Sequence, residues 1–203
     1  MAKWIKIRAW ADNNPIKIIV GMSILLRLLL IILYRNITIY PDSADYIHLA
    51  ERLVFFDLGG YEGECTPGYP LLISLSGLSL PVTIFLQNIT GIITTVFLYK
   101  ILLLINFRVR HALLLTMGVI CYLPIIFFEF CILTETLTFF FITLTFYFLF
   151  GILYARRTGI ISYIALCLTC SYLVLIKPFY IFLPVLLFII LIFHNRKRRV
   201  VIY

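Results

Sequence analysis

The stretch IKIIVGMSILLRLLLIILY, residues 16–34, is apolar apart from a few positions such as Lys17 and Arg27. A helix needs about 20 apolar residues to cross a bilayer, so this stretch predicts a membrane span. The whole chain has the same character, because 63% of its residues are hydrophobic and only 13% are charged. A soluble domain has roughly 45–50% apolar and about 25% charged residues. The composition therefore predicts an all-α integral membrane protein whose solvent is lipid.

Apolar stretches recur along the chain, and we predict about six transmembrane helices in a single membrane domain over residues 1–203. The first span is not a cleaved signal peptide, because its apolar run is long, carries Arg27 and lacks a small-residue cleavage site. Between the first two spans lies an outer loop, residues 35–81. The predicted spans are residues 16–34, 82–105, 113–130, 132–154, 160–176 and 179–193.

Lysine and arginine predict how the chain is oriented. Basic residues concentrate in cytoplasmic loops, and with six crossings most of them fall on one side of the membrane. Both termini are then cytoplasmic and the outer loop is extracytoplasmic. The net charge of +8 is therefore a topology signal, and the scatter of basic residues over short loops argues against nucleic-acid binding. The basic residues on the predicted cytoplasmic side are Lys3, Lys6, Arg8, Lys17, Lys100, Arg108, Arg110, Arg156, Arg157, Arg196, Lys197, Arg198 and Arg199.

The outer loop opens with YPDSADYIHLAERL, residues 40–53, which gathers acids in a chain that has few of them. We predict an amphipathic helix over residues 42–56. The turn-rich segment DLGGYEGECTPG follows. The next stretch, YPLLISLSGLSLP, is apolar but too short to span, and predicts a second helix at the membrane interface. The apolar residues at helical spacing in the first helix are Tyr46, Leu49, Ala50 and Leu53.

Asp42 stands where the first of these helices begins. We predict that it caps the helix, with Asp45 three residues on completing a capping-box-like pair. A carboxylate at the lip of an apolar bundle can also hold its proton more tightly and act as a base. Tyr46 shares a helix face with Asp42 because the two are four residues apart. Asp45 is the other carboxylate that could serve as this base.

These segments resemble the GT-C superfamily, membrane glycosyltransferases that use polyprenyl-phosphate-linked sugars and include protein mannosyltransferases and aminoarabinose transferases. PDSADYIHLAERL followed by TPGYPLLISL is similar to that family's first outer loop. CILTETLTFFF resembles the Ser/Thr-Glu pair with which the family's fourth span begins. LVLIKPFYIFLPVLLFIIL resembles the turn of a basic residue and proline between the family's fifth and sixth spans. Arg27 fits a basic residue in the first span. The matching outer-loop residues are Asp42, Ser43, Tyr46, Pro67, Tyr69, Pro70, Leu71 and Leu72.

The resemblance implies an inverting hexosyl- or pentosyltransferase of a bacterial or archaeal plasma membrane, acting on the cell envelope. It would pass a sugar from a polyprenyl-phosphate donor, a membrane lipid, to an extracytoplasmic glycan, lipid or protein. Asp42 would be the general base, and Lys177 would stabilise the leaving phosphate. The substrate- and donor-binding residues that the resemblance implies are Asp45, Tyr46, Tyr69, Glu135, Lys177 and Arg27.

Simpler interpretations stay open for three of these residues. Lys177 is also explained as a lysine that extends to the membrane interface. Glu135 is also explained as an acid favoured at a helix start. A central Arg costs about 2.5–3.5 kcal/mol on insertion scales, so Arg27 either contacts a phosphate or pairs with Glu135 or Glu129.

Other functions remain in competition with this one. Members of the family are longer, so the chain resembles their N-terminal half. Three explanations stay open: a truncated product, a subunit that a partner chain completes with the missing spans, or a remnant of the family without activity. The alternative function is a non-catalytic membrane protein that binds polyprenyl phosphate or scaffolds a partner enzyme. A transporter ranks last, because polar groups gather at the outer lip instead of the midplane and no internal repeat is visible.

We expect no obligatory metal or other cofactor. The loop carboxylates could bind a divalent ion, but the one histidine near them in sequence, His48, points off the face shared by Asp42 and Tyr46. Cys167 and Cys170 lack the histidine or second cysteine pair that a metal site needs, and predict packing instead.

Overall fold

The computed structural model describes residues 14–34, 36–57, 59, 61, 63, 65–155 and 158–200, with side chains up to residue 194. Some residues of the topology argument lie outside this part, namely Lys3, Lys6, Arg8, Arg156 and Arg157, as do the side chains of residues 196–199. All regular elements in the described part are helical, which confirms the predicted class. The helices are α2 (Pro15–Leu33), α3 (Pro41–Phe55), α4 (Gly68–Leu75), α5 (Leu80–Leu104), α6 (Val109–Ile120), α7 (Leu123–Phe128), α8 (Glu135–Leu153), α9 (Ile160–Ile176), the 3₁₀ helix η1 (Pro178–Ile181) and α10 (Phe182–Val200).

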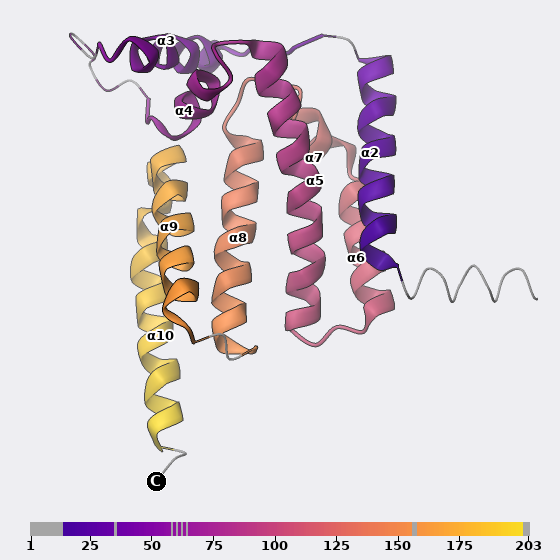
Figure 1. Ribbon diagram of the computed structural model, residues 1–203, viewed down its shortest axis with the longest axis vertical. Helices are drawn as coiled ribbons and strands as arrows, with labels where there is room; N and C mark the ends of the chain where they lie inside the picture. The colour runs from indigo at the N-terminus through magenta and orange to yellow at the C-terminus, as the bar shows by residue number, and fades with distance from the viewer. Residues whose placement is uncertain are drawn as a thin grey trace, which may run out of the picture.

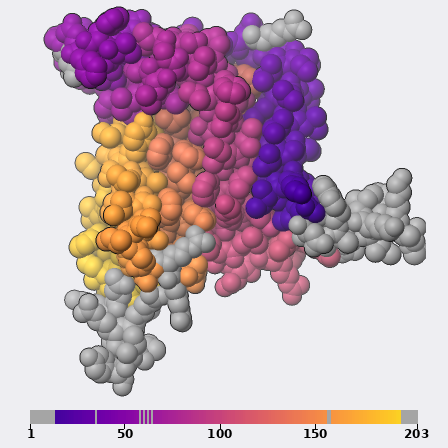
Figure 2. All heavy atoms as spheres, viewed as in Figure 1, coloured from indigo at the N-terminus to yellow at the C-terminus, as the bar shows by residue number. Residues whose placement is uncertain are grey.

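Most helices stand upright in a bundle, and two lie across one of its ends (Figure 1). Within the bundle, α5 packs against α8, α8 against α9, and α2 against both α5 and α6. Helix α3 runs across the end, and α4 lies between it and α9. The space-filling view shows this α3–α4 layer covering part of the end of the bundle (Figure 2).

The length and composition of the helices support the prediction of a membrane protein. Among the described residues, three helices are long and apolar enough to cross a bilayer, namely α2, α5 and α8. The helix α9 and the segment Pro178–His194 are apolar but shorter. Helices α2 and α10 expose many large apolar side chains, as helices facing lipid do. Six crossings therefore stay a prediction.

The predicted span over residues 113–130 is not one continuous helix, because the structure has two helices there. Helix α6 ends at Ile120, and α7 begins at Leu123. Pro124 has no N–H to donate to the carbonyl of Ile120, so a continuous helix would lose a hydrogen bond and meet a steric clash at this point. The chain turns at Cys121 and Tyr122 instead.

The outer loop forms both predicted helices. Helix α3 matches the predicted range 42–56 closely, with Leu49 and Ala50 buried on its inner face. Helix α4 begins at Gly68, one residue before the second apolar stretch, and ends at Leu75. Gly77 and Leu78 then turn the chain with positive φ angles of 67° and 62°. The position of α4 at a membrane interface stays a prediction.

Candidate functional site

Ser43, and not Asp42, organises the start of α3. The backbone N–H of Tyr40 donates to Ser43 Oγ over 2.9 Å, and Ser43 Oγ donates to the carbonyl of Ile132 over 2.7 Å. Tyr40 is the capping residue and Pro41 begins the helix, so Asp42 lies in its first turn with its side chain exposed. The predicted capping role of Asp42 and Asp45 is therefore wrong. Pro41 suits the first helical position because its φ is preset, which moves the cap back to Tyr40.

Two tyrosines connect the layer to the bundle. The rings of Tyr46 on α3 and Tyr69 on α4 meet edge to face with centroids 5.3 Å apart. The Tyr69 hydroxyl is buried and donates to Gln87 Oε1 over 2.6 Å. Gln87 Nε2 in turn donates to the carbonyls of Glu129 and Cys131, each over 2.9 Å. Gln87 thereby holds the segment that leads to α8, a role that its presence in an apolar span hinted at but that sequence analysis missed.

Lys177 and Glu135 form an ion pair at the same end of the bundle. Lys177 follows the last residue of α9, Glu135 is the first residue of α8, and Lys177 Nζ donates to Glu135 Oε1 over 2.9 Å. Their side chains are 35% and 37% exposed, so the pair is partly buried, and Glu135 Oε2 itself is buried. The sequence pointed to each residue separately, and the fold places them together.

The predicted site residues at this end of the bundle, which we call the lip, are Asp42, Tyr46, Tyr69, Glu135 and Lys177. Some of them shift one another's pKa. Burial raises the pKa of Tyr46, and the nearby carboxylates of Asp42 and Glu135 raise it further. Burial also raises the pKa of Tyr69, with smaller effects from Tyr46 and Glu135. Tyr46 thus contacts Tyr69, Lys177 pairs with Glu135, and the carboxylates of Asp42 and Glu135 both lie near enough to Tyr46 to raise its pKa. Asp45 lies on the same helix with an exposed side chain.

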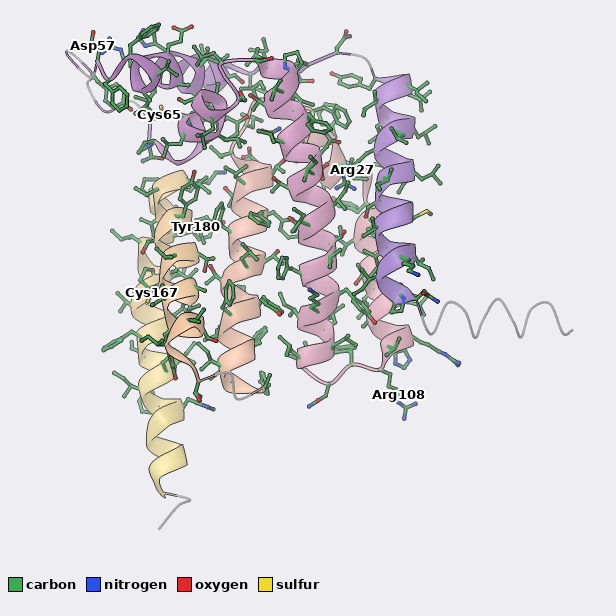
Figure 3. The ribbon with its side chains drawn as sticks, viewed as in Figure 1. Arg27, Asp57, Cys65, Arg108, Cys167 and Tyr180 are labelled. Carbon is green, nitrogen blue, oxygen red and sulfur yellow. The ribbon has the colours of Figure 1, made fainter. Side chains whose placement is uncertain are left out.

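Arg27 lies inside the bundle, where it pairs with Glu129 (Figure 3). Its Nε donates to Glu129 Oε2 over 2.7 Å, and Nη2 donates to the other carboxylate oxygen. Nη1 donates to the carbonyl of Ser23 over 3.0 Å. Arg27 is 4% exposed and Glu129 is 1% exposed. Of the partners left open by the sequence, the structure selects Glu129.

Among the described residues, no three His, Cys, Asp or Glu side chains come together as a metal site would require. His48 is exposed on α3, and Cys167 is exposed while Cys170 is buried. The structure assigns no metal ligands within the described ranges, and the absence of an obligatory metal stays a prediction.

Comparison with known proteins adds no relative, because no family model, no curated protein and no solved structure matches this chain. The assignment of a function accordingly rests on the residues of the lip and on their geometry.

Proposed function

We propose that the chain is a membrane glycosyltransferase, or the N-terminal module of one, that transfers a sugar from a polyprenyl-phosphate-linked donor to an extracytoplasmic acceptor. The observation that supports this proposal is the gathering of Asp42, Tyr46, Glu135 and Lys177 at one end of an apolar bundle. These residues come from two helices, α3 and α8, and from the end of a third, α9. A carboxylate, a tyrosine and an ion pair at one lip provide groups for proton transfer and for binding a polar substrate.

In the proposed reaction Asp42 is the general base. Its carboxylate takes the proton of the acceptor hydroxyl while the hydroxyl oxygen attacks the anomeric carbon of the donor sugar. The bond between that carbon and the phosphate oxygen breaks with inversion, and polyprenyl phosphate leaves with the bonding electrons. The exposed side chain of Asp42 is open to an acceptor that arrives from the aqueous side.

Lys177 is proposed to stabilise the charge on the leaving phosphate. An ammonium group has three N–H donors, and Glu135 Oε1 takes one of them. The partial exposure of Lys177 leaves its head group accessible to a second anion. Arg27 and Glu129 support the same site indirectly, because Glu129 lies in the segment between α7 and α8 that leads to Glu135.

Replacement of Asp42 by Asn tests the proposal. Asp42→Asn keeps the size of the side chain but removes the base, so we expect transfer to fall by about 100- to 10,000-fold. Folding is expected to be nearly unchanged, because Ser43 and not Asp42 organises the start of α3. The measurement is transfer of tritiated sugar from a panel of polyprenyl-phosphate hexoses and pentoses in native membranes, where any partner chain is present.

Asp45→Asn is the matched control, since Asp45 is also an exposed carboxylate on α3. We expect this variant to keep most of its activity. Loss of transfer in Asp45→Asn with retention in Asp42→Asn would mean that Asp45 is the base. Full activity in both variants would refute base catalysis by this helix, and donor binding without any transfer would favour the non-catalytic alternative.

A further inference from the structure

A cavity of about 190 Å³ lies inside the bundle beside the Arg27–Glu129 pair. Helices α5, α6, α7 and α8 contribute most of its wall, which is mainly apolar, with Val119 of α6, Ile125 of α7 and Phe139 of α8 among the lining residues. Its polar lining includes Glu135 and Thr136 at the start of α8. The cavity therefore combines an apolar body with a small polar region.

Two oxygen atoms of this polar region lack a hydrogen-bond partner in the described part of the chain, Glu135 Oε2 and Thr136 Oγ1. Thr136 is 7% exposed. Other threonines of α8 donate to the carbonyl four residues back, as Thr138 does to Thr134 over 2.8 Å. The corresponding carbonyl for Thr136 is that of Ile132, which already accepts the Ser43 hydroxyl. Ile132 precedes the capping residue Thr134, so its carbonyl lies outside α8, and the Thr136 hydroxyl is left without a partner among the described residues.

The charges around the cavity are balanced. Glu129 pairs with Arg27, and Glu135 Oε1 pairs with Lys177. An anion entering the cavity would meet no cation that lacks a partner among these residues, and would face the unused carboxylate oxygen of Glu135. A group that donates a hydrogen bond would satisfy that oxygen, and a hydroxyl could also accept from Thr136.

We infer that this cavity binds a small uncharged hydroxyl compound with an apolar body about the size of one six-membered ring. An apolar cavity of about 150 Å³ is known to hold benzene, so 190 Å³ leaves room for a ring and a hydroxyl group. The hydroxyl lies against Glu135 Oε2 and Thr136 Oγ1, and the ring lies among the apolar side chains. This binding does not depend on the proposed transfer reaction.

The test compares benzyl alcohol, toluene and benzoate as probes of the protein in nanodiscs, by ligand-observed NMR with empty nanodiscs subtracted. Benzyl alcohol is expected to bind about fivefold or more tightly than toluene, because it adds hydrogen bonds to buried acceptors. Benzoate is expected to bind more weakly than either. Equal binding of benzyl alcohol and toluene, or tightest binding of benzoate, would overturn the inference.

Variants then locate the bound probe. Thr136→Val should reduce the preference for benzyl alcohol over toluene, whereas Thr145→Val should leave it unchanged. Thr145 is the matched control because it is a buried threonine of α8 whose hydroxyl donates to the carbonyl of Phe141 over 2.7 Å. Val119→Phe, which adds bulk to the cavity wall, should weaken the binding of benzyl alcohol and toluene alike. The same preference in Thr136→Val as in the wild type would show that the alcohol binds elsewhere.

Thermal stability separates a ligand site from a structural role of Thr136. Without a probe, Thr136→Val should unfold at the same temperature as the wild type or higher, because it removes an unpaired buried hydroxyl. Stabilisation by added benzyl alcohol should be smaller in this variant. A lower unfolding temperature together with an unchanged response to benzyl alcohol would refute the proposal.

Discussion

At the scale of single residues, Gly91 allows a buried ion pair to form inside an apolar bundle. A Cβ atom at this position of α5 would overlap the Glu129 carboxylate and lie 2.5 Å from Arg27 Nη2. The pair needs this room because each charge is nearly fully buried, and a buried charge is tolerated only when a partner satisfies it. Gly91 therefore acts through its missing side chain and not through backbone freedom.

Gly91→Ala tests this role. The added methyl group should displace the Glu129 carboxylate and Arg27 Nη2 from their present positions. Both partners remain, so the cost should stay below about 3–5 kcal/mol, which is the cost of removing one partner of a buried pair. We expect a marked fall in the free energy of unfolding, measured by denaturant titration in micelles. Gly118→Ala in α6 is the control, because its Cβ would meet nothing within 4 Å. That change should stabilise the helix by about 0.5–1 kcal/mol, and equal effects of the two changes would contradict the role given to Gly91.

At the scale of elements, α4 holds the outer layer on the bundle. The hydroxyl of Ser74 on α4 donates to the carbonyl of Ala50 on α3 over 2.9 Å. At the other side, the Tyr172 hydroxyl of α9 donates to the carbonyl of Gly68 over 2.9 Å. The approach of α4 to α9 is close, because a Cβ on Gly68 would lie 2.5 Å from backbone atoms of Leu175. A short helix thus sets the distance between the carboxylates of α3 and the end of α9.

Gly68→Ala should push α4 away from α9. Its new methyl group would meet backbone, which cannot move aside as a flexible side chain can. We expect faster hydrogen–deuterium exchange in α4 and a lower unfolding temperature, with exchange in α8 little changed. Gly159→Ala, at the start of α9 with open space around it, should change neither. Unchanged exchange in α4 of Gly68→Ala would show that the contact is not needed to hold the layer.

At the scale of the whole molecule, the two ends of the bundle differ in charge and in structure. The α3–α4 layer, with Asp57 near its edge, lies at one end, and Arg108 lies at the other (Figure 3). The basic side chains of the opposite end match the bias that orients membrane proteins. The arrangement agrees with an outer lip formed by the layer, while the orientation itself stays a prediction.

Reporter insertions test this orientation. A reporter placed after Asp57 should lie outside the cell, whereas one after Asn106, in the turn between α5 and α6, should lie in the cytoplasm. Alkaline phosphatase activity, which needs an oxidising compartment, distinguishes the two sides. An active enzyme at Asn106 and an inactive one at Asp57 would reverse the topology and remove the extracytoplasmic site with it.

Sequence alone determined the class of the protein and most of its helices, because long apolar runs and helical spacing are local properties that tertiary contacts rarely reverse. It also singled out Asp42, Tyr46, Glu135 and Lys177. It missed the break before α7, although Pro124 was visible, because the apolar run continues through it. It also misplaced the helix cap at Asp42, because Pro41 and Ser43 together suit a cap two residues earlier, at Tyr40.

Only the tertiary structure decided how the polar residues pair. Arg27 and Glu129 are 102 residues apart, and Glu135 and Lys177 are 42 apart. No local pattern favours one partner over another across such distances, since the choice depends on which helix faces meet. The tertiary structure also leaves the Thr136 hydroxyl without a partner among the described residues. A buried polar group in an apolar bundle is costly without a partner, and packing decides which groups find one.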